Sequence, residues 1–281
     1  MGQVVVITGL ADGMGRETAK LLAAAGDTIA GFDMDAAGIA SLQTELDGLS
    51  PSPGKTHHLV PLNILDRPGI LRFRDEVLAK YTRVDTVLSN VGIGFFGPFE
   101  EIDLEAARRC LEINVIGAAA IFQAFVPAMR RQKGGKLIAM SSLVGQVPFP
   151  FESIYAASKF AIEGMVMSFR YELAPFGIRV ALIEPAQVST TFAAKIHTLP
   201  PEGSPYRERA RRFIARDDEL IKTAPTPLQA ARRIVEVIHR DRPPFHNQVD
   251  FMSTFFLFLN RFLPVRLRDM ILLNHMDIKE A

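Results

Sequence analysis

Three residues near the middle of the chain have the types and spacing needed to move a proton: Ser142, Tyr155 and Lys159. Tyr155 and Lys159 are four residues apart in a helical pattern, so both side chains emerge on one face of a helix. A free tyrosine has a pKa of about 10 and is a poor acid or base near neutral pH. An adjacent ammonium favours the phenolate, so we predict that Lys159 lowers the pKa of Tyr155 and makes it a usable acid and base. Ser142 is predicted at the end of a strand, where it can hydrogen-bond the reacting oxygen.

The segments that must position these residues alternate between short β-branched runs and longer helical patterns. The predicted strands are Val4–Thr8, Thr28–Phe32, His57–Val60, Thr86–Ser89, Lys136–Met140 and Arg179–Ile183. The predicted helices are Met14–Ala25, Ala36–Leu46, Arg67–Lys80, Leu104–Met129 and Ser153–Pro175. Strand and helix in alternation predict an α/β fold, a doubly wound parallel sheet with helices on both faces and right-handed crossovers. We predict one catalytic domain over residues 1–248 and an apolar helical extension over 249–281.

The composition excludes several classes of protein. A formal net charge of +1 over 281 residues gives no electrostatic reason to expect a nucleic acid partner. The single cysteine, Cys110, excludes an internal disulfide and suits a reducing, cytoplasmic compartment. The six histidines show no Cys/His cluster or H-E-x-x-H motif, so no metal site is predicted. The N-terminus leads straight into a strand without a basic segment, which argues against a signal peptide.

A glycine-rich turn follows the first predicted strand and opens the first helix. Gly9, Gly13 and Gly15 let the backbone turn tightly and approach a pyrophosphate at the helix N-terminus. Asp33 ends the second strand about 20 residues further on, where a carboxylate accepts hydrogen bonds from the adenosine ribose hydroxyls and repels a 2′-phosphate. Arg16 argues for NADP, but an arginine that opens a helix is commonly solvated or salt-bridged. We therefore interpret the cofactor as NAD rather than NADP.

The ordered motifs resemble those of the short-chain dehydrogenase/reductase family over roughly residues 3–192. Thr8–Gly15 resembles its T-G-x-x-x-G-x-G loop, Ser89–Gly92 its N-N-A-G segment, and Glu184–Thr190 its P-G-x-V-x-T segment. Asn63 stands where the family usually has an aspartate at the adenine. The resemblance implies a single Rossmann-type domain, a homodimer or homotetramer, and the catalytic set Asn114, Ser142, Tyr155 and Lys159. The cofactor contacts that we predict are Thr8, Gly9, Asp12, Gly13, Met14, Gly15, Asp33, Asn63, Ile64, Asn90, Val91, Gly92, Tyr155, Lys159, Pro185, Val188 and Thr190.

Further stretches, such as Tyr155–Gly164 and Ala174–Arg179, resemble the branch of 17β-hydroxysteroid and retinol dehydrogenases. The resemblance implies that Tyr155 takes the hydroxyl proton while hydride passes to NAD, that Lys159 holds the nicotinamide ribose, and that Asn114 bends a helix and connects the site to water. The predicted function is the interconversion of a hydrophobic secondary alcohol and its ketone. The alternatives are an NADP-dependent ketone reductase, a nucleotide-sugar epimerase or dehydratase, and a non-catalytic nucleotide-binding protein. The glycine spacing and the short region after Thr190 argue against the epimerase.

Aromatic residues fall beside the segments expected at the nicotinamide. Phe95, Phe96, Phe149 and Phe192 are the predicted substrate contacts, and Phe151 lies among them. A pocket lined in this way favours an apolar substrate such as a steroid, retinoid or aryl alcohol, although we expect about half of these rings to fill the core. The substrate loop is predicted over 190–224.

The C-terminal stretch is unusually apolar. Its uninterrupted apolar run is far shorter than the ~20 residues of a spanning helix, and Asn260, Arg261 and Pro264 break it. Residues 251–273 combine apolar and basic side chains and can lie on a membrane surface. Burial against the pocket entrance or against a second subunit is an equal alternative.

Overall fold

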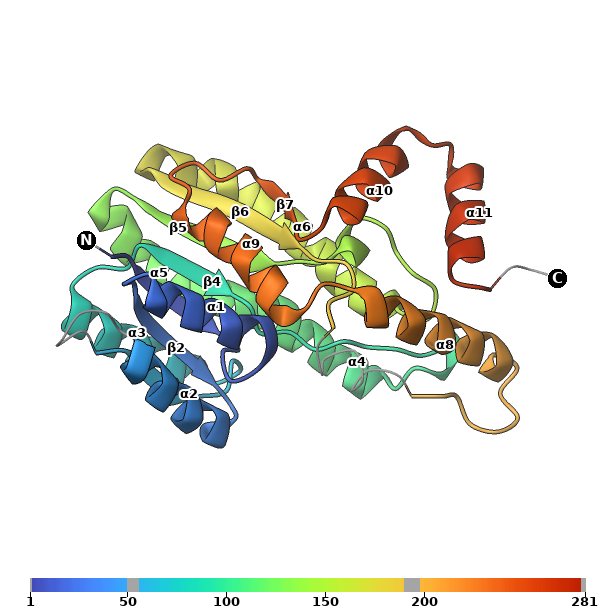
Figure 1. Cartoon of the computed structure of the whole chain (residues 1–281), viewed down its shortest axis with the longest axis horizontal. Coiled ribbons are helices and arrows are strands. Elements are labelled where there is room, and N and C mark those ends of the chain that lie inside the picture. The colour runs from blue at the N-terminus through green and yellow to red at the C-terminus, as the bar shows by residue number, and fades with distance from the viewer. Residues whose placement is uncertain (1, 50–55, 190–197, 279–281) are drawn as a thin grey trace.

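The computed structural model describes residues 2–49, 56–189 and 198–278. Its centre is a seven-stranded sheet in which every neighbouring pair is parallel, in the order β3-β2-β1-β4-β5-β6-β7 (Figure 1). The strands are β1 (Val4–Thr8), β2 (Thr28–Asp33), β3 (His58–Pro61), β4 (Thr86–Ser89), β5 (Gly135–Met140), β6 (Ile178–Glu184) and β7 (His246–Gln248). The first six agree with the predicted strands to within one residue at each end. The seventh was not predicted.

Helices cover both faces of the sheet. The α-helices are α1 (Gly13–Ala24), α2 (Ala36–Leu49), α3 (Arg67–Tyr81), α4 (Leu104–Leu111), α5 (Gly117–Gln132), α6 (Ser153–Leu173), α8 (Arg207–Thr223), α9 (Pro227–His239), α10 (Phe251–Phe262) and α11 (Val265–His275). A π-helical turn, η2 (Glu112–Ile116), joins α4 to α5. Helices α1, α2 and α9 pack on one face, and α3, α5 and α6 on the other. This arrangement confirms the predicted doubly wound α/β fold.

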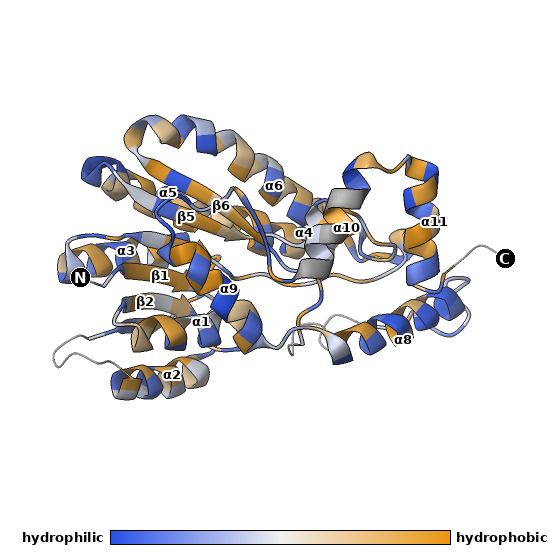
Figure 2. Cartoon of the chain, turned by 45° about the horizontal axis from the view of Figure 1, so that its top comes forward, coloured by the Kyte–Doolittle hydropathy of each residue, from blue (hydrophilic) through white to orange (hydrophobic). Residues whose placement is uncertain are grey.

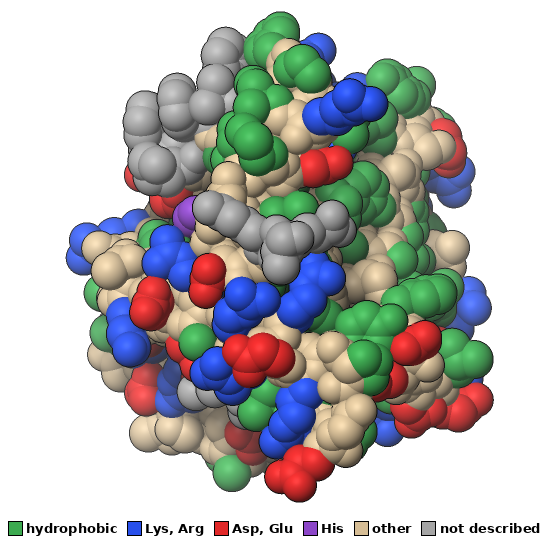
Figure 3. Space-filling view, turned by 90° about the vertical axis from the view of Figure 1, so that its right-hand side faces the viewer, with side chains coloured by type: hydrophobic (Ala, Val, Ile, Leu, Met, Phe, Trp, Pro, Cys, Tyr) green, Lys and Arg blue, Asp and Glu red, His purple; other side chains and the backbone are tan. Residues whose placement is uncertain are grey.

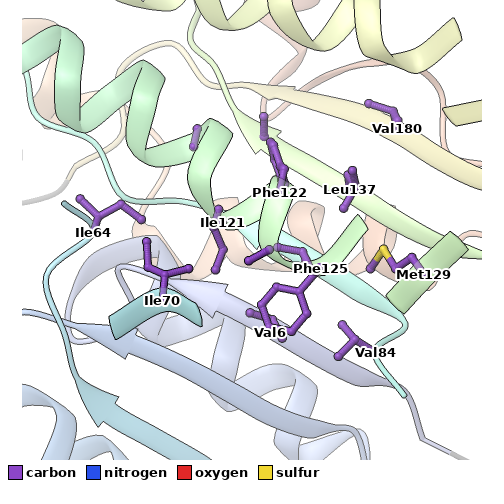
Figure 4. Close-up of a cluster of buried hydrophobic side chains, with 14 of the residues drawn as sticks. Val6, Ile64, Ile70, Val84, Ile121, Phe122, Phe125, Met129, Leu137 and Val180 are labelled. Carbon is purple, nitrogen blue, oxygen red and sulfur yellow. The ribbon is translucent and has the colours of Figure 1, made fainter. Parts of the chain in front are cut away.

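Two apolar layers hold the sandwich together, one on each side of the strands. The strands are apolar nearly throughout while the outer helix faces are mixed, as expected for a sheet buried on both sides (Figure 2). In the layer beneath α5, Phe125 lies near Val6 of β1 and stacks edge-on with Phe73 of α3, with ring centres 6.3 Å apart (Figure 4). Such layers fix the carboxyl ends of β1, β4 and β5, where the predicted site residues lie.

One helical stretch, Leu104–Gln132, is long and apolar enough to cross a membrane by length and composition alone. Half of its most apolar window is buried inside the structure. Its second part, α5, supplies Ile121, Phe122 and Phe125 to the layer on the sheet. Burial in the domain therefore explains its apolar character.

The C-terminal segment forms two helices, α10 and α11, that stand beside α8 at one end of the molecule (Figure 1). Leu272, Met276 and Ile278 are buried in an apolar cluster with Phe96 and Phe213. Two arginines of α8 fasten this segment by donating to the main-chain carbonyls of Ile278 (Arg209, 3.2 Å) and His275 (Arg216, 2.9 Å). The inner face of the segment is thus buried against Phe96, one of the predicted substrate contacts, and against α8.

Candidate active site

The glycine loop lies where the sheet order changes direction, with β1 between β2 and β4. Gly9 and Gly13 have φ angles of +71° and +56°, which favour glycine. A Cβ on Gly15 would stand 2.1 Å from the carbonyl oxygen of Gly9, so only glycine allows the loop to close on itself. Asp12 caps α1 by accepting the Gly13 N–H at 2.7 Å. The loop, with Met14 in the first turn of α1, therefore presents a helix N-terminus at a switch point, which fits a pyrophosphate.

Two of the predicted cofactor contacts, Thr8 and Asn90, use their side chains to hydrogen-bond the backbone of the loop and of the segment after β4. Thr8 Oγ1 accepts the N–H groups of Asn90 (3.0 Å) and Val91 (3.2 Å), and Asn90 Nδ2 donates to the carbonyl of Gly9 (2.8 Å). These bonds join the ends of β1 and β4. Thr8 and Asn90 thus hold the loop in shape, which supports a positioning role for both side chains.

Asp33 and Arg16, which gave opposite indications on the cofactor, are engaged differently. The carboxylate of Asp33 accepts the N–H groups of Ala11 (3.2 Å) and Asp35 (3.0 Å) at the rim of the loop. Arg16 donates to the carbonyl of Ala11 (2.9 Å) and forms a 2.7 Å ion pair with Glu45 of α2. The guanidinium is therefore tied to α2, and it is not a free partner for a phosphate.

The remaining predicted cofactor residues are spread around the same edge. Asn63 follows β3 and is exposed, and its side-chain oxygen accepts the Leu65 N–H at 2.9 Å. Ile64 is buried in the core, where it packs against Gly117, so a purely structural role accounts for it. Pro185 and Val188 follow β6. Thr190 and Phe192 lie outside the described residues.

Asn114 sits in the π-helical turn that interrupts the predicted helix Leu104–Met129. Its Oδ1 accepts the Ile93 N–H (2.8 Å), and its Nδ2 donates to the Ile93 carbonyl (2.9 Å) and to Ser158 Oγ (2.9 Å). The wider turn allows the buried amide to bond the chain after β4 and the helix α6 at once. The π-helical turn interrupts the helix where the resemblance implies a bend, and the amide joins three segments. Burial raises the pKa of the adjacent Cys110 thiol to about 11, in keeping with a structural cysteine.

The three residues with proton-transfer chemistry meet beyond the end of β5. Ser142 accepts the Val144 N–H (3.2 Å) and donates to the Pro185 carbonyl (3.3 Å), and its hydroxyl lies close enough to Tyr155 to lower the pKa of the phenol. Lys159 Nζ lies 5.6 Å from the centre of the Tyr155 ring and donates to the Met140 carbonyl at 2.9 Å. Ser142, rather than Ser141, is thus the serine beside the tyrosine. A Cβ on Gly92 would stand 3.6 Å from Lys159 Nζ, so the glycine leaves space beside the amine.

The pKa of Tyr155 is raised, whereas the sequence predicted that it would be lowered, so the predicted direction was wrong. Desolvation raises the pKa of Tyr155, and the nearby Glu152 carboxylate raises it further, whereas the hydrogen bond from Ser142 lowers it. Burial also lowers the pKa of Lys159 to about 8, against the charges of Cys110 and Glu163. The pattern of residue types carried no information on burial, which here outweighs the charge of the neighbour.

Three aromatic rings from distant segments meet beside this group. Phe96 follows β4, Phe151 precedes α6, and Phe213 comes from α8, with ring centres 5.5–5.8 Å apart. Phe151 has a φ of +65°, an uncommon conformation for a bulky residue that is expected mainly where the surrounding structure imposes it. Phe149 packs in the same cluster, and Phe95 is partly buried next to Phe96. Phe213 was not predicted, although α8 has an apolar stripe that contains it.

Sequence reasoning also missed a pair of acidic residues, one of which acts on the tyrosine. Glu152 lies one turn before Tyr155, and Asp217 of α8 acts on Glu152. Desolvation, followed by the charge of Asp217, raises the pKa of Glu152 to about 8. Asp217 is buried and accepts from Gln187 Nε2 at 3.1 Å. Nothing in the local pattern indicates this pair, because the two residues are 65 positions apart and meet only through the packing of α8.

Comparison with known proteins bears directly on this constellation. The family described as short chain dehydrogenase matches residues 3–199. The chain belongs to the short-chain dehydrogenase family. Homologues in this family are alcohol dehydrogenases and reductases that act on CH–OH groups with NAD or NADP.

Individual relatives cover the same part of the chain. Human 17-beta-hydroxysteroid dehydrogenase type 1 is 34% identical over 205 residues, which are 71% of this chain and 61% of the relative. Dehydrogenase/reductase SDR family member 7B of Mus musculus is 32% identical over 205 residues, 72% of this chain and 62% of the relative. The chain thus spans less than two thirds of these curated relatives. A short-chain dehydrogenase from Streptomyces avermitilis has the same fold, with a TM-score of 0.78 and 27% identity over 98% of this chain and 96% of that one.

Proposed function

We propose that this short-chain dehydrogenase interconverts a hydrophobic secondary alcohol and its ketone with NAD. The observation that carries the proposal is the meeting of three side chains beyond β5, where the Ser142 hydroxyl acts on the Tyr155 phenol and the buried amine of Lys159 lies 5.6 Å from the centre of the ring. Groups of this kind act on an alcohol or carbonyl oxygen rather than on a peptide or phosphate. Bound NAD supplies the hydride acceptor, and the protein supplies position and proton transfer.

In the direction of oxidation, Ser142 holds the alcohol oxygen and Tyr155 takes its proton as the phenolate, so this direction requires the deprotonated tyrosine and is favoured by higher pH. The raised pKa of Tyr155 favours the protonated phenol at neutral pH, so the same group is a ready proton donor when a ketone is reduced. Lys159, with a pKa of about 8, can exchange a proton in the range in which enzymes work. Asn114 has bonds from both ends of its amide to Ile93 and Ser158, which supports a role in positioning rather than direct proton transfer.

NAD is supported over NADP by the two side chains that surround the adenosine end of the glycine loop. Asp33 presents a carboxylate there, and Arg16 is held by Glu45. A carboxylate accepts the two ribose hydroxyls and repels a phosphate. The loop residues proposed to hold the cofactor are Gly9, Gly13, Met14 and Gly15.

An apolar substrate is supported by the aromatic cluster of Phe96, Phe151 and Phe213, which includes Leu143, the residue after Ser142. Phe96 and Phe213 are buried in this cluster, so the partly buried rings of Phe149 and Phe151 offer the surface that flat, rigid alcohols of the steroid, retinoid or aryl type match. The human relative is named as a hydroxysteroid dehydrogenase, which is in keeping with this class. We propose that α8 and the C-terminal segment close the substrate side, since both pack on these rings.

The molecule has two exposed apolar surfaces that suggest partners. Leu104, Ile116, Phe160 and Met167 are exposed on α4, η2 and α6, and they support assembly into a homodimer or homotetramer. A second surface lies on the outer side of the C-terminal segment, where Figure 3 shows hydrophobic side chains above a mixed field of charges. Its exposed members are Phe262, Val265, Leu267, Met270 and Ile271. They support peripheral membrane contact of a cytoplasmic enzyme.

The proposed reaction is tested by replacing Tyr155 with phenylalanine and measuring NADH formation with a panel of steroid, retinoid and aryl alcohols. Removal of a general acid–base group lowers turnover by roughly 10²–10⁴-fold. The variant should fold and bind NADH with unchanged affinity in a fluorescence titration, because the ring is retained. Tyr171→Phe, which removes the hydroxyl of an exposed tyrosine on the same helix, is the matched control. Turnover undiminished in Tyr155→Phe would overturn the proposal.

A further inference from the structure

Three potential metal ligands converge next to the active site, and the first of them lies two helical turns beyond Tyr155 on the same helix. Glu163 comes from α6, Glu184 ends β6, and His246 begins β7. One carboxylate or imidazole atom of each lies within 4.8 Å of the others. We propose that these three side chains form a binding site for a divalent first-row metal ion of the Zn²⁺ type. This site is separate from the chemistry proposed for Tyr155.

The burial of the two carboxyl groups is the first argument for a cation. Glu184 is completely buried and Glu163 is only 7% exposed. Buried carboxylates require a compensating positive charge or strong donors. Because their oxygens lie within 4.8 Å of each other, two ionised carboxylates at this place would repel each other.

An incompletely satisfied carboxyl group is the second argument. Within the described part of the chain, Glu163 Oε1 and the neighbouring Ser141 Oγ are both buried without a hydrogen bond of ordinary length, although the Ser141 hydroxyl lies close enough to act on the Glu163 carboxyl group. Both atoms lie close to Gly145, where a Cβ would stand 2.8 Å from Ser141 Oγ and 3.2 Å from Glu163 Cγ. A buried polar atom without a partner costs free energy unless a ligand satisfies it.

Hydrogen bonds to both carboxylate oxygens fix the orientation of Glu184, as is common for a metal ligand. Its Oε2 accepts from Gln248 Nε2 at 2.7 Å, and its Oε1 accepts from Gln146 Nε2 and lies 2.9 Å from His246 Nδ1. Amide donors that fix a ligating carboxylate are typical of the shell outside a metal site. Both glutamines can keep these bonds while the Glu184 oxygens also face an ion.

The ligand set indicates the kind of ion. Two carboxylate oxygens and one imidazole nitrogen suit Zn²⁺, whereas Mg²⁺ and Ca²⁺ prefer oxygen alone. Zinc bonds to nitrogen and oxygen are ~2.0–2.2 Å long, so ligand atoms around one ion stand roughly 3–4 Å apart. His246 Nδ1 lies 2.9 Å from Glu184 and 3.9 Å from Glu163, so only a small closure is needed. The side chain of His246 is 42% exposed, which gives an ion a path from solvent.

The position of the site suggests what the ion does. Ser141 precedes Ser142, and Glu163 lies one helical turn after Lys159. An ion held by α6, β6 and β7 would therefore fasten the segments that carry the serine and lysine of the active site. Its binding should stabilise the folded chain.

The test is a calorimetric titration of Zn²⁺ into the full-length protein after treatment with EDTA, together with thermal unfolding with and without Zn²⁺. We expect one Zn²⁺ per chain and a higher unfolding temperature, with no such effect of Mg²⁺. His246→Ala and Glu163→Gln should each weaken binding by at least tenfold. The matched control is His239→Ala, because His239 is 38% exposed and lies 2.7 Å from Asp27.

The outcomes separate the alternatives. Retention of the site in His239→Ala and its loss in His246→Ala support the proposal. No saturable binding to the natural chain, or the same affinity in His246→Ala, overturns it. Thermal stability that responds to pH but not to Zn²⁺ also overturns it, since the two carboxyl groups then share only a proton. If Glu163→Gln does not fold, His246→Ala still tests the site, because the half-exposed His246 side chain can be removed with little effect on folding.

Discussion

Replacing Asp33 with serine should turn the cofactor preference of the enzyme toward NADP. The carboxylate of Asp33 is held at the end of β2 by the N–H groups of Ala11 (3.2 Å) and Asp35 (3.0 Å). Its charge is therefore fixed at the rim of the glycine loop before a cofactor binds. In this fold the adenosine ribose lies at that position, so the carboxylate meets either two hydroxyls or a 2′-phosphate.

The magnitude follows from two effects of the charge. A hydrogen bond to a charged group contributes about 1.5–3 kcal/mol, so loss of the carboxylate should weaken NAD binding by roughly 10–100-fold. Two unit charges 4 Å apart repel by ~1 kcal/mol in water and by ~4 kcal/mol near a protein surface. Because Asp33 is half-buried, we take the repulsion between its carboxylate and the 2′-phosphate as about 1.5 kcal/mol. Removal of this repulsion should strengthen NADP binding by roughly tenfold. The NAD/NADP ratio should therefore fall by about 10²–10³ in total.

The assay measures kcat/KM with NAD and NADP and the dissociation constants of NADH and NADPH by fluorescence. Arg16→Ala, made in the natural and the Asp33→Ser chains, is the control. It should leave NADPH affinity unchanged because the guanidinium is engaged by Glu45 and Ala11. An unchanged NAD/NADP ratio in Asp33→Ser would remove the basis for the NAD assignment. Loss of NADPH binding in Arg16→Ala would show that Arg16 leaves Glu45 for the phosphate.

Two further predictions concern the pH profile and the exposed surfaces. Because Glu152 raises the pKa of Tyr155, Glu152→Gln should move the alkaline-rising limb of kcat/KM for alcohol oxidation to lower pH and speed oxidation several-fold near pH 8. Asp217→Asn should move it the other way, because it lets Glu152 ionise at lower pH; shifts of the same sign would contradict this coupling. Ile116→Asp should yield smaller assemblies in light scattering, whereas Met270→Asp should keep the assembly and weaken flotation with anionic vesicles. Equal behaviour of the two variants in both measurements would reject separate roles for the two surfaces.

The part of the fold that could be predicted is the part set by local patterns. Five of the first six strands are short, largely buried runs, and β3 is a partly buried one; their apolar residues and flanking turns mark all six to within one residue. The glycine loop was also predictable, because the φ angles of Gly9 and Gly13 demand a specific residue type. Strand β7 has the sequence His-Asn-Gln and carries no apolar signal. It exists because β6 offers an edge, which is a property of the assembled sheet.

The π-helical turn at the active site is a second feature that local sequence patterns do not predict. The apolar spacing of Leu104–Met129 continues through the turn, so periodicity alone predicts one helix. The irregularity is imposed by Asn114, whose buried amide must satisfy Ile93 and Ser158 together. A polar residue inside an apolar helical pattern was the available signal, and only the resemblance to the family gave it meaning.

The electrostatics of the site depend still more on tertiary structure. From residue types, Lys159 beside Tyr155 should lower the pKa of the phenol, yet desolvation and Glu152 reverse the direction. Glu152 in turn owes its raised pKa partly to Asp217, which arrives on α8 from the segment after residue 190. The segment that contributes Phe213 to the aromatic cluster therefore also sets the charge felt by the tyrosine. Changes in α8 should alter substrate preference and pH profile together, so the two properties of this enzyme are physically coupled.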